Sequence, residues 1–274
     1  MLPADNHVHS EWSYDTSAEA SMARSCEQAI EIGLPAVAFT EHMEFIRAGE
    51  GDAIRGLAAD QRWSNRIRPF DVEGYLAAID DCRQRYPDLR ILSGVEAGEP
   101  HLFAASAHAA LGGHGLDRVL GSLHAIPCDG VLMGADSHLF ARRSAPEAMR
   151  MYLGELVRLI EGSDLFEILA HLDFPRRYWP SGRGAYREQD FEEEYRAALR
   201  ALARSGRVLE VNTKSPLASV DLVRWWWSEG GTACSFGSDA HWPTRVGDRF
   251  KQAVDIVEAA GFRPGRDPYD FWRR

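Results

Sequence analysis

Short apolar runs of strand character alternate along this chain with longer segments whose apolar residues recur at helical spacing. Residues 72–86 show the helical pattern, because Val72, Tyr75, Ile79 and Cys82 lie three or four positions apart. The predicted strands cover seven segments, at residues 4–9, 35–40, 90–96, 119–124, 166–171, 208–212 and 232–238. The predicted helices cover residues 17–33, 71–86, 100–114, 149–160, 191–206, 218–229 and 250–257. This alternation predicts a parallel sheet with helices packed on it.

The number of strands favours a closed barrel over an open doubly wound sheet. No G-x-G-x-x-G turn opens any predicted helix, and such a turn is typical of the open fold that binds dinucleotides. No linker, repeat or low-complexity tract interrupts the chain, so residues 1–274 are predicted to form a single domain of ordinary barrel length. Residues 43–70 are polar and have no clear period, and a loop of this length is often functional.

Each predicted strand leads into a polar group that could bind a metal ion. The segments that carry these groups read DNHVHS, AFTEH, SGVEAGE, GSLH, EILAHLD, EVNTK and SFGSDAH. The sixth group is an asparagine, whereas the other six segments supply histidine, glutamate or aspartate. In a parallel β/α barrel the carboxyl ends of all strands meet at one mouth. Groups spread over residues 5–241 are therefore expected to converge there.

The first and last strands carry the clearest pairs of ligand-type residues. His7 and His9 are two positions apart on a strand, so both side chains point to the same face. Asp239 and His241 repeat that arrangement at the end of the last strand. Burying two imidazoles side by side costs free energy unless both rings have partners. These pairs therefore indicate metal binding rather than packing.

Single ligand-type residues occupy the same structural position on other strands. His42, His124 and His171 each end a strand, and a purely structural role would have to explain that coincidence three times. Glu96 ends its strand after Ser-Gly-Val, where a carboxylate is costly unless it bridges cations. Asp15 follows the first strand, and its position alone leaves open whether it binds a metal or caps the next helix.

The predicted ligand set contains six imidazoles and three carboxylates, and no thiolate: His7, His9, Asp15, His42, Glu96, His124, His171, Asp239 and His241. Nine ligands suit two or three divalent ions, and mixed nitrogen and oxygen donors fit Zn, Mn, Fe or Co better than Ca or Mg. Three such ions would leave about three excess positive charges, which would attract a phosphate group. A water that bridges the ions would lose a proton near neutral pH and become a nucleophile.

The order of these motifs resembles the PHP family, the polymerase and histidinol phosphatase superfamily. The motifs are H-x-H, T-E-H, G-x-E, G-S-x-H, H-x-D and G-S-D-A-H, and they cover essentially the whole chain. The resemblance implies a distorted (β/α)7 TIM-like barrel of parallel strands with a trinuclear metal centre. It also implies one ligand group for each ion: His7, His9, Glu96 and Asp239; the bridging Glu96 with His124 and His171; and Asp15, His42 and His241. Glu96, Asp239 and His241 would then act in catalysis through a metal-bridging hydroxide.

Within the family, the chain length, the long loop after T-E-H and the segment AHLDFPRRY resemble the histidinol-phosphatase branch. This implies a phosphomonoesterase that converts L-histidinol phosphate and water to L-histidinol and phosphate in histidine biosynthesis. Arg176 and Arg177 are predicted to bind the substrate, because guanidinium groups pair well with phosphate. Lys214 is predicted to bind it as well, because it lies just past the sixth strand. A solvated basic pair is the alternative interpretation of the two arginines. The segment VNTKSP also differs from the N-T-x-G-x-R-like continuation of that branch.

The composition of the chain limits which classes of partner it is expected to bind. The net charge of −10 and the pI of about 5.5 argue against a dedicated nucleic-acid binder and favour a small phosphorylated metabolite. The alternatives are a PHP-type phosphodiesterase or exonuclease that acts on oligonucleotides or small nucleotides, and a noncatalytic regulatory module, which should have lost ligands. The sequence shows no signal peptide, no membrane span and no C-x-x-C pair among its four cysteines. A cytoplasmic protein with reduced thiols is expected.

Overall fold

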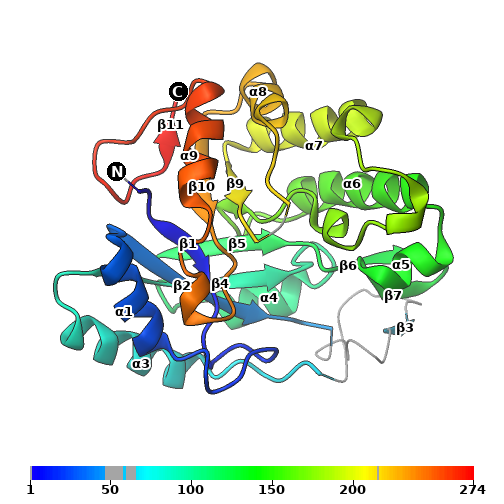
Figure 1. The fold of residues 1–274 in the computed structure, drawn as a ribbon. Helices are drawn as coiled ribbons and strands as arrows, with labels where there is room; N and C mark the ends of the chain where they lie inside the picture. The colour runs from blue at the N-terminus through cyan, green and yellow to red at the C-terminus, as the bar shows by residue number, and fades with distance from the viewer. Residues whose placement is uncertain (1, 47–57, 60–65, 215) are drawn as a thin grey trace.

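The predicted barrel of parallel strands is confirmed by the computed structural model, which describes residues 2–46, 58–59, 66–214 and 216–274 (Figure 1). The main sheet has the strand order β1-β2-β4-β5-β8-β9-β10-β11. The first seven of these strands are parallel to their neighbours, and only β11 pairs antiparallel, with β10. The strands are β1 Asp5–Val8, β2 Ala36–Met43, β4 Arg90–Gly98, β5 Arg118–Ser122, β8 Ile168–Leu169, β9 Val208–Asn212, β10 Ala233–Gly237 and β11 Trp272–Arg273.

The sheet curls until β1 meets the segment that follows β10. Val8 and Ala240 form an isolated parallel bridge. On either side of it, the Asp239 amide donates to the His7 carbonyl at 2.7 Å and the His9 amide donates to the Ala240 carbonyl at 2.9 Å. The two ends of the chain's long parallel sheet are thereby joined at the level of the predicted metal ligands.

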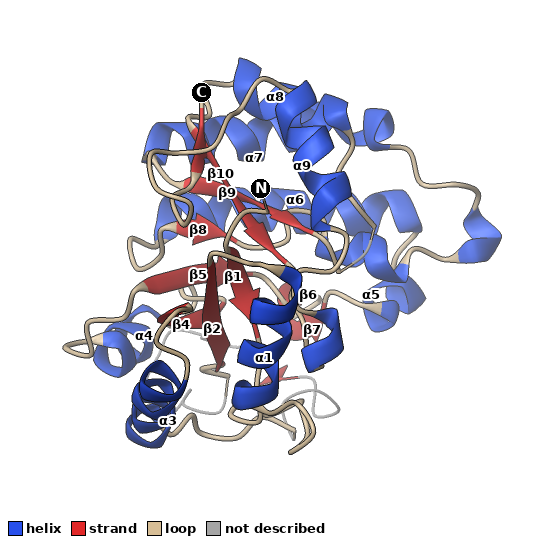
Figure 2. Cartoon of the chain, turned by 60° about the vertical axis from the view of Figure 1, so that its left-hand side comes forward, coloured by secondary structure: helices blue, strands red, loops and turns tan. Residues whose placement is uncertain are grey.

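Helices surround the strands in Figure 2 and bury their apolar faces against them. Local interactions set where these helices begin and end. The Asp71 side chain caps the start of α3 by accepting a hydrogen bond from the Gly74 amide at 3.0 Å. Helix α1 ends at Gly33, whose φ of 75° favours glycine. The α-helices are α1 Met22–Ile32, α3 Val72–Arg85, α4 Ala104–Leu111, α5 Ser137–Arg142, α6 Ala145–Gly162, α7 Glu192–Ser205, α8 Val220–Ser228 and α9 Phe250–Ala259. The 3₁₀ helices are η1 Phe174–Tyr178, η2 Ser181–Arg183, η3 Glu188–Phe191 and η4 Pro243–Arg245.

A second, smaller sheet was not predicted from the sequence. It has the order β3-β7-β6, with β3 Ala58–Ala59, β6 Ala125–Cys128 and β7 Val131–Gly134. The β6–β7 hairpin turns at Asp129 and Gly130, whose φ angles of 51° and 75° suit the Asp-Gly turn that joins tightly coupled antiparallel strands. β3 lies inside the predicted loop 43–70, of which residues 47–57 and 60–65 fall outside the described residues.

Strand lengths also differ from those expected. β2 and β4 run on to Met43 and Gly98 because the two strands pair with each other over eight successive positions, and Gly98 also pairs with Ser122 of β5. The predicted strand 166–171 shrinks to β8, because its residues pair with β5 and β9 only at Ile168 and Leu169. Among the helices in the described ranges, none is long and apolar enough to cross a membrane.

Candidate metal centre

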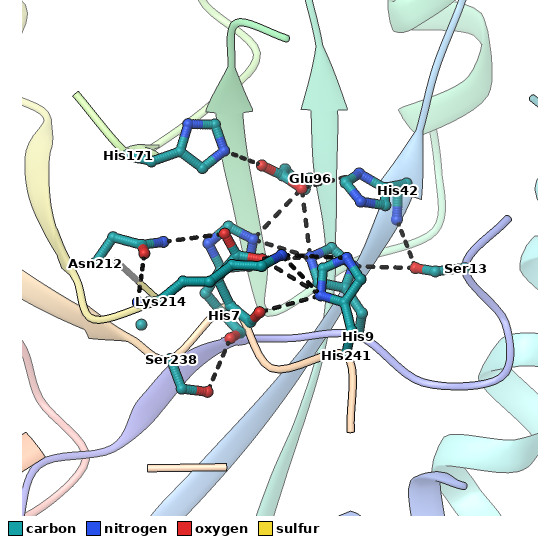
Figure 3. Close-up of polar contacts among 12 residues, drawn as sticks. His7, His9, Ser13, His42, Glu96, His171, Asn212, Lys214, Ser238 and His241 are labelled. Carbon is teal, nitrogen blue, oxygen red and sulfur yellow. Dashed lines mark hydrogen bonds and ion pairs between the residues drawn. The ribbon is translucent and has the colours of Figure 1, made fainter. Parts of the chain in front are cut away.

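The nine predicted ligands lie together at the carboxyl ends of the strands, as Figure 3 shows for those that it labels. They come from β1, β2 and β4 and from the segments that follow β1, β5, β8 and β10. Most of these side chains are buried, and Asp15 and His241 are the more exposed members at 22% and 17%. Residues far apart in the sequence therefore converge at one mouth of the barrel, as the sequence predicted.

Glu96 lies at the centre of the cluster and contacts five imidazoles. Its Oε1 is 2.7 Å from His171 Nε2 and 3.2 Å from His124 Nε2. Its Oε2 is 2.9 Å from His42 Nδ1 and 3.4 Å from the Nε2 atoms of both His7 and His9. One carboxylate thus joins imidazoles from four separate strands, a geometry that suits a ligand shared between cations.

The electrostatics of Glu96 follow from this crowding. Burial alone would raise the pKa of its carboxyl, but the imidazoles of His124, His7 and His42 hold that pKa well below its usual value. The carboxylate is only 1% exposed, so solvent does little to stabilise its charge. Positive charge from neighbouring groups must therefore offset the cost of its burial.

Asp15 and His241 form the outer corner of the cluster with His42. Asp15 Oδ2 is 3.1 Å from His241 Nε2 and 3.4 Å from His42 Nε2. This contact favours the ligand interpretation of Asp15 over the helix-cap one, because α1 is capped by the Ser21 side chain instead. His241 connects inward to Asp239, whose Oδ1 is 3.5 Å from His241 Nδ1 and 3.6 Å from His9 Nε2.

The donor atoms of these side chains fit divalent metal ions. Four sets of three have their ligand atoms within 4.8 Å of one another: His7, His9 and Asp239; His9, His42 and His241; Glu96, His124 and His171; and His42, Glu44 and His124. Within the described residues, Asp15 Oδ1 and Glu96 Oε2 are buried without a hydrogen-bond partner. Buried carboxylate oxygens seldom lack a partner, so these two are suited to accept a cation. Imidazole and carboxylate donors together fit Zn or a neighbouring transition metal.

A second layer of buried carboxylates, absent from the sequence prediction, holds the imidazoles in place. Glu210 on β9 accepts through Oε1 at 2.6 Å from His7 Nδ1 and through Oε2 at 2.6 Å from the His171 amide. With Nδ1 of His7 held by a carboxylate, its Nε2 is directed toward Glu96. Such outer hydrogen bonds fix the tautomer and orientation of metal-binding histidines.

Three further glutamates, Glu41, Glu44 and Glu99, belong to this outer layer. Glu41 accepts from the hydroxyls of Ser10 and Ser13, and Ser13 Oγ lies 3.0 Å from His9 Nδ1. Behind His124, Glu44 Oε1 is 2.8 Å from the imidazole Nδ1, while Glu99 Oε1 accepts from the His124 amide at 2.5 Å. A signal was available for Glu41 and Glu210, because each is a lone charge inside an apolar strand and must have a partner there.

Gly237 on β10 leaves the space that the His7–Glu210 pair occupies. A Cβ at this position would overlap Glu210 Oε1 and lie 2.6 Å from His7 Cβ. Gly237→Ala is therefore expected to shift the pair and weaken zinc affinity by about ten- to a hundredfold, the usual effect of disturbing an outer-layer partner. Zinc titration of metal-stripped protein measures this affinity. Gly154→Ala on α6, where a Cβ would meet nothing within 4 Å, is the control. Equal affinities of the two variants would contradict the role of Gly237.

Of the three predicted substrate-binding residues, Arg177 and Lys214 line the pocket that opens over the cluster. Arg177 Nη2 donates to Asp239 Oδ2 at 2.7 Å and to Asn212 Oδ1 at 2.9 Å. Lys214 Nζ lies 2.9 Å from Asp239 Oδ1. Burial would raise the pKa of the Asp239 carboxyl, but Lys214 and Arg177 hold it well below its usual value. Two cations thus stand beside the ligands.

Arg176 lies differently from its neighbour. Its Nη1 donates to Glu188 at 2.6 Å and to Asp173 at 3.1 Å, and the residue is not among the described ones that line the pocket. Substrate binding by Arg176 stays a prediction. Besides the ligands, Arg177 and Lys214, the pocket is lined by Tyr14, Arg66, Gly134, Asp136, Phe174 and Tyr178.

Comparisons with known proteins agree with this fold. The chain is 25% identical to the histidinol-phosphatase of Lactococcus lactis subsp. lactis over 269 residues, which cover 96% of this chain and 93% of that protein. It is 27% identical to a Deinococcus radiodurans protein named "Probable histidinol-phosphatase", with 94% of each chain covered. A crystal structure of the Lactococcus lactis histidinol phosphate phosphatase complexed with zinc, L-histidinol and phosphate superposes with a TM-score of 0.81 at 23% identity, covering 96% and 95% of the two chains.

The family model of the PHP domain matches residues 5–214, well over half of the chain. The matched residues contain the strands and segments that supply seven of the nine predicted ligands, and Asp239 and His241 follow in the same barrel. This chain belongs to the PHP domain family.

Proposed function

We propose that this protein is a metal-dependent phosphomonoesterase that hydrolyses L-histidinol phosphate to L-histidinol and phosphate. The observation that carries the proposal is the contact of one carboxylate, Glu96, with five imidazoles beside the cations Arg177 and Lys214. That combination joins a site for metal ions to a site for an anion. The relatives named as histidinol-phosphatases, similar over nearly their whole length, support the choice of substrate and a place in histidine biosynthesis.

The ligand assignment is part of the proposal. Two or three divalent ions, with zinc the first candidate, would be held by three groups of residues: His7, His9, Glu96 and Asp239; Glu96, His124 and His171; and Asp15, His42 and His241. The short contacts of Asp15 with His42 and His241 support the third group. Bound ions would polarise the phosphoryl oxygens and lower the pKa of a water molecule, so that hydrolysis proceeds near neutral pH.

The chain's own residues would orient the substrate. Arg177 and Lys214 reach the pocket from η1 and from the segment after β9, and each already contacts Asp239. A phosphoryl group beside Asp239 would therefore find a guanidinium and an ammonium within reach. Positive groups aimed at the phosphoryl oxygens stabilise the charge that develops there during transfer. The outer layer of glutamates would keep the imidazoles from turning away as the charge changes.

We also propose that residues 1–274 act as one domain in the cytoplasm. All four cysteines are buried and free, which suits a reducing compartment. The largest cluster of buried apolar residues contains both Val8 of β1 and Trp272 of β11, so that both ends of the chain contribute to the same barrel.

A substrate panel tests the proposed function. The zinc-loaded protein is expected to hydrolyse L-histidinol phosphate with a kcat/KM at least about a hundredfold higher than for phenyl phosphate, since recognition of the leaving group adds to recognition of the phosphate. Hydrolysis of a short oligonucleotide is expected to be negligible. Treatment with a chelator should abolish turnover, and added zinc or manganese should restore it. Faster cleavage of the oligonucleotide than of either monoester would contradict the proposal and favour a phosphodiesterase.

A further inference from the structure

The pocket over the metal centre is lined by groups of both charges. Arg177 and Lys214 stand on the side of Asp239, where the phosphoryl group would bind. The lining also contains Asp136, which is the only carboxylate among the described lining residues that lies outside the predicted ligand set. Such a carboxylate repels a second phosphate and attracts a cation. The charge pattern of the pocket therefore suits a substrate with an anionic end and a cationic end.

Asp136 is fixed in its position by the start of α5. Its Oδ1 accepts from the His138 amide at 2.7 Å and lies 3.0 Å from the Nδ1 atom of the same residue. The carboxylate lies beside Gly134, because a Cβ built there would be 3.3 Å from Oδ2 and 3.6 Å from Oδ1. Gly134 also lines the pocket. Asp136 thus uses Oδ1 to cap the helix at a position next to the pocket.

No ion pair with lysine or arginine neutralises Asp136 in the part of the chain that the structure describes. Its side chain is 30% exposed, so that a ligand can approach it. A carboxylate that is held in place and is only partly exposed to solvent can pair favourably with a cationic group of a ligand. Arg66 shares the pocket lining but is not among the ion-pair partners of Asp136.

Aromatic rings also line the pocket. Phe174 packs with its ring centre 5.0 Å from that of His171 and 5.6 Å from that of Tyr178, and both Phe174 and Tyr178 line the pocket. Tyr14 lines it from the side of His42, at a ring distance of 5.2 Å. Such rings favour a substrate with a flat, partly apolar body.

We propose that Asp136 is a specificity-determining residue, which pairs with the amino group of the leaving alcohol and makes the enzyme selective for phosphate monoesters of small amino alcohols. The inference rests on the proposed function and extends it to one residue outside the metal centre. Asp136 takes no part in phosphoryl transfer. It is expected to lower the KM of substrates that carry an ammonium group and to leave other substrates unaffected.

The test compares Asp136→Asn with the wild type on three substrates: L-histidinol phosphate, its analogue without the amino group, 3-(imidazol-4-yl)propyl phosphate, and phenyl phosphate. Asparagine keeps an oxygen that can cap α5, so the fold of the pocket wall is preserved. The wild type is expected to prefer L-histidinol phosphate over the analogue by about ten- to a hundredfold, the usual effect of one hydrogen-bonded charge. In the variant this preference should fall to about threefold or less, through a higher KM, with phenyl phosphate hydrolysed as before.

Asp129→Asn is the matched control, because Asp129 lies at the tip of the same hairpin, pairs with Arg143 and is 58% exposed. It should retain the full preference. An unchanged preference in Asp136→Asn, or an equal loss on all three substrates, would overturn the inference. Wild-type protein that hydrolyses phenyl phosphate but not L-histidinol phosphate would instead contradict the proposed function, and the inference with it.

Discussion

Glu96→Gln is expected to lower kcat on L-histidinol phosphate by about a thousandfold or more, the largest effect of any single change in this protein. Glutamine has nearly the same shape as glutamate but carries no charge. It therefore removes the anion that five imidazoles surround, without opening a cavity. A neutral amide also binds divalent ions much more weakly than a carboxylate does, so the ion that shares this ligand should be lost.

Steady-state kinetics together with elemental analysis check this prediction. Metal content should fall by about one ion per chain, while the far-ultraviolet circular dichroism spectrum stays that of the wild type. Glu73→Gln, on the exposed face of α3, is the control and should change neither quantity. Full activity of Glu96→Gln at saturating zinc would show that Glu96 is not a metal ligand, even with its five imidazole contacts.

Arg177→Lys is expected to lower kcat/KM by about a hundredfold, the usual cost of removing a group that stabilises transition-state charge. Lysine keeps the positive charge but presents one compact ammonium instead of a planar fork. It cannot hold Asp239 and Asn212 while also pairing with a phosphoryl group, as the geometry of Arg177 permits. The loss should therefore be seen equally with L-histidinol phosphate and with phenyl phosphate.

Arg176→Lys is the informative comparison, because it changes the adjacent residue in the same way. Arg176 connects Asp173 to Glu188 and the Leu217 carbonyl, so its replacement is expected to lower Tm by a few degrees, about 1 kcal/mol of stability, with kcat/KM within about threefold of the wild type. A loss of activity as large as that of Arg177→Lys would show instead that both arginines contact the substrate, as the sequence alone predicted.

The barrel and its ligand cluster could be predicted because both follow from periodic features of the sequence. Apolar runs mark the strands, and the rule that parallel strands end at one mouth places His7, Glu96 and Asp239 together. The position of Asp15 is harder to predict from the sequence, since this residue lies on a loop whose path no periodicity describes. Its contacts with His42 and His241 depend on the turn after β1.

Features without a period in the sequence were missed. β8 pairs with its neighbours at only two residues, and β11 joins the sheet through a contact between the last residues and β10. The roles of Glu44, Glu99 and Glu210 depend on which imidazole nitrogen faces inward, and side-chain orientation of that kind is set by tertiary packing. The turn at Asp129 and Gly130 is different, because an Asp-Gly pair between two apolar runs indicates a hairpin from the sequence alone.

The hairpin that carries Asp136 to the pocket belongs to the small sheet, whereas the proposed metal ligands are anchored to the large one. Selectivity and chemistry would thus rest on two different sheets, which pack against each other where Val95 of β4 and Leu132 of β7 share one apolar cluster. A graft that exchanges residues 125–136 could redirect the enzyme to other alcohols while its ions stay where they are. The same division would let the substrate preference change during evolution while the metal centre stays the same.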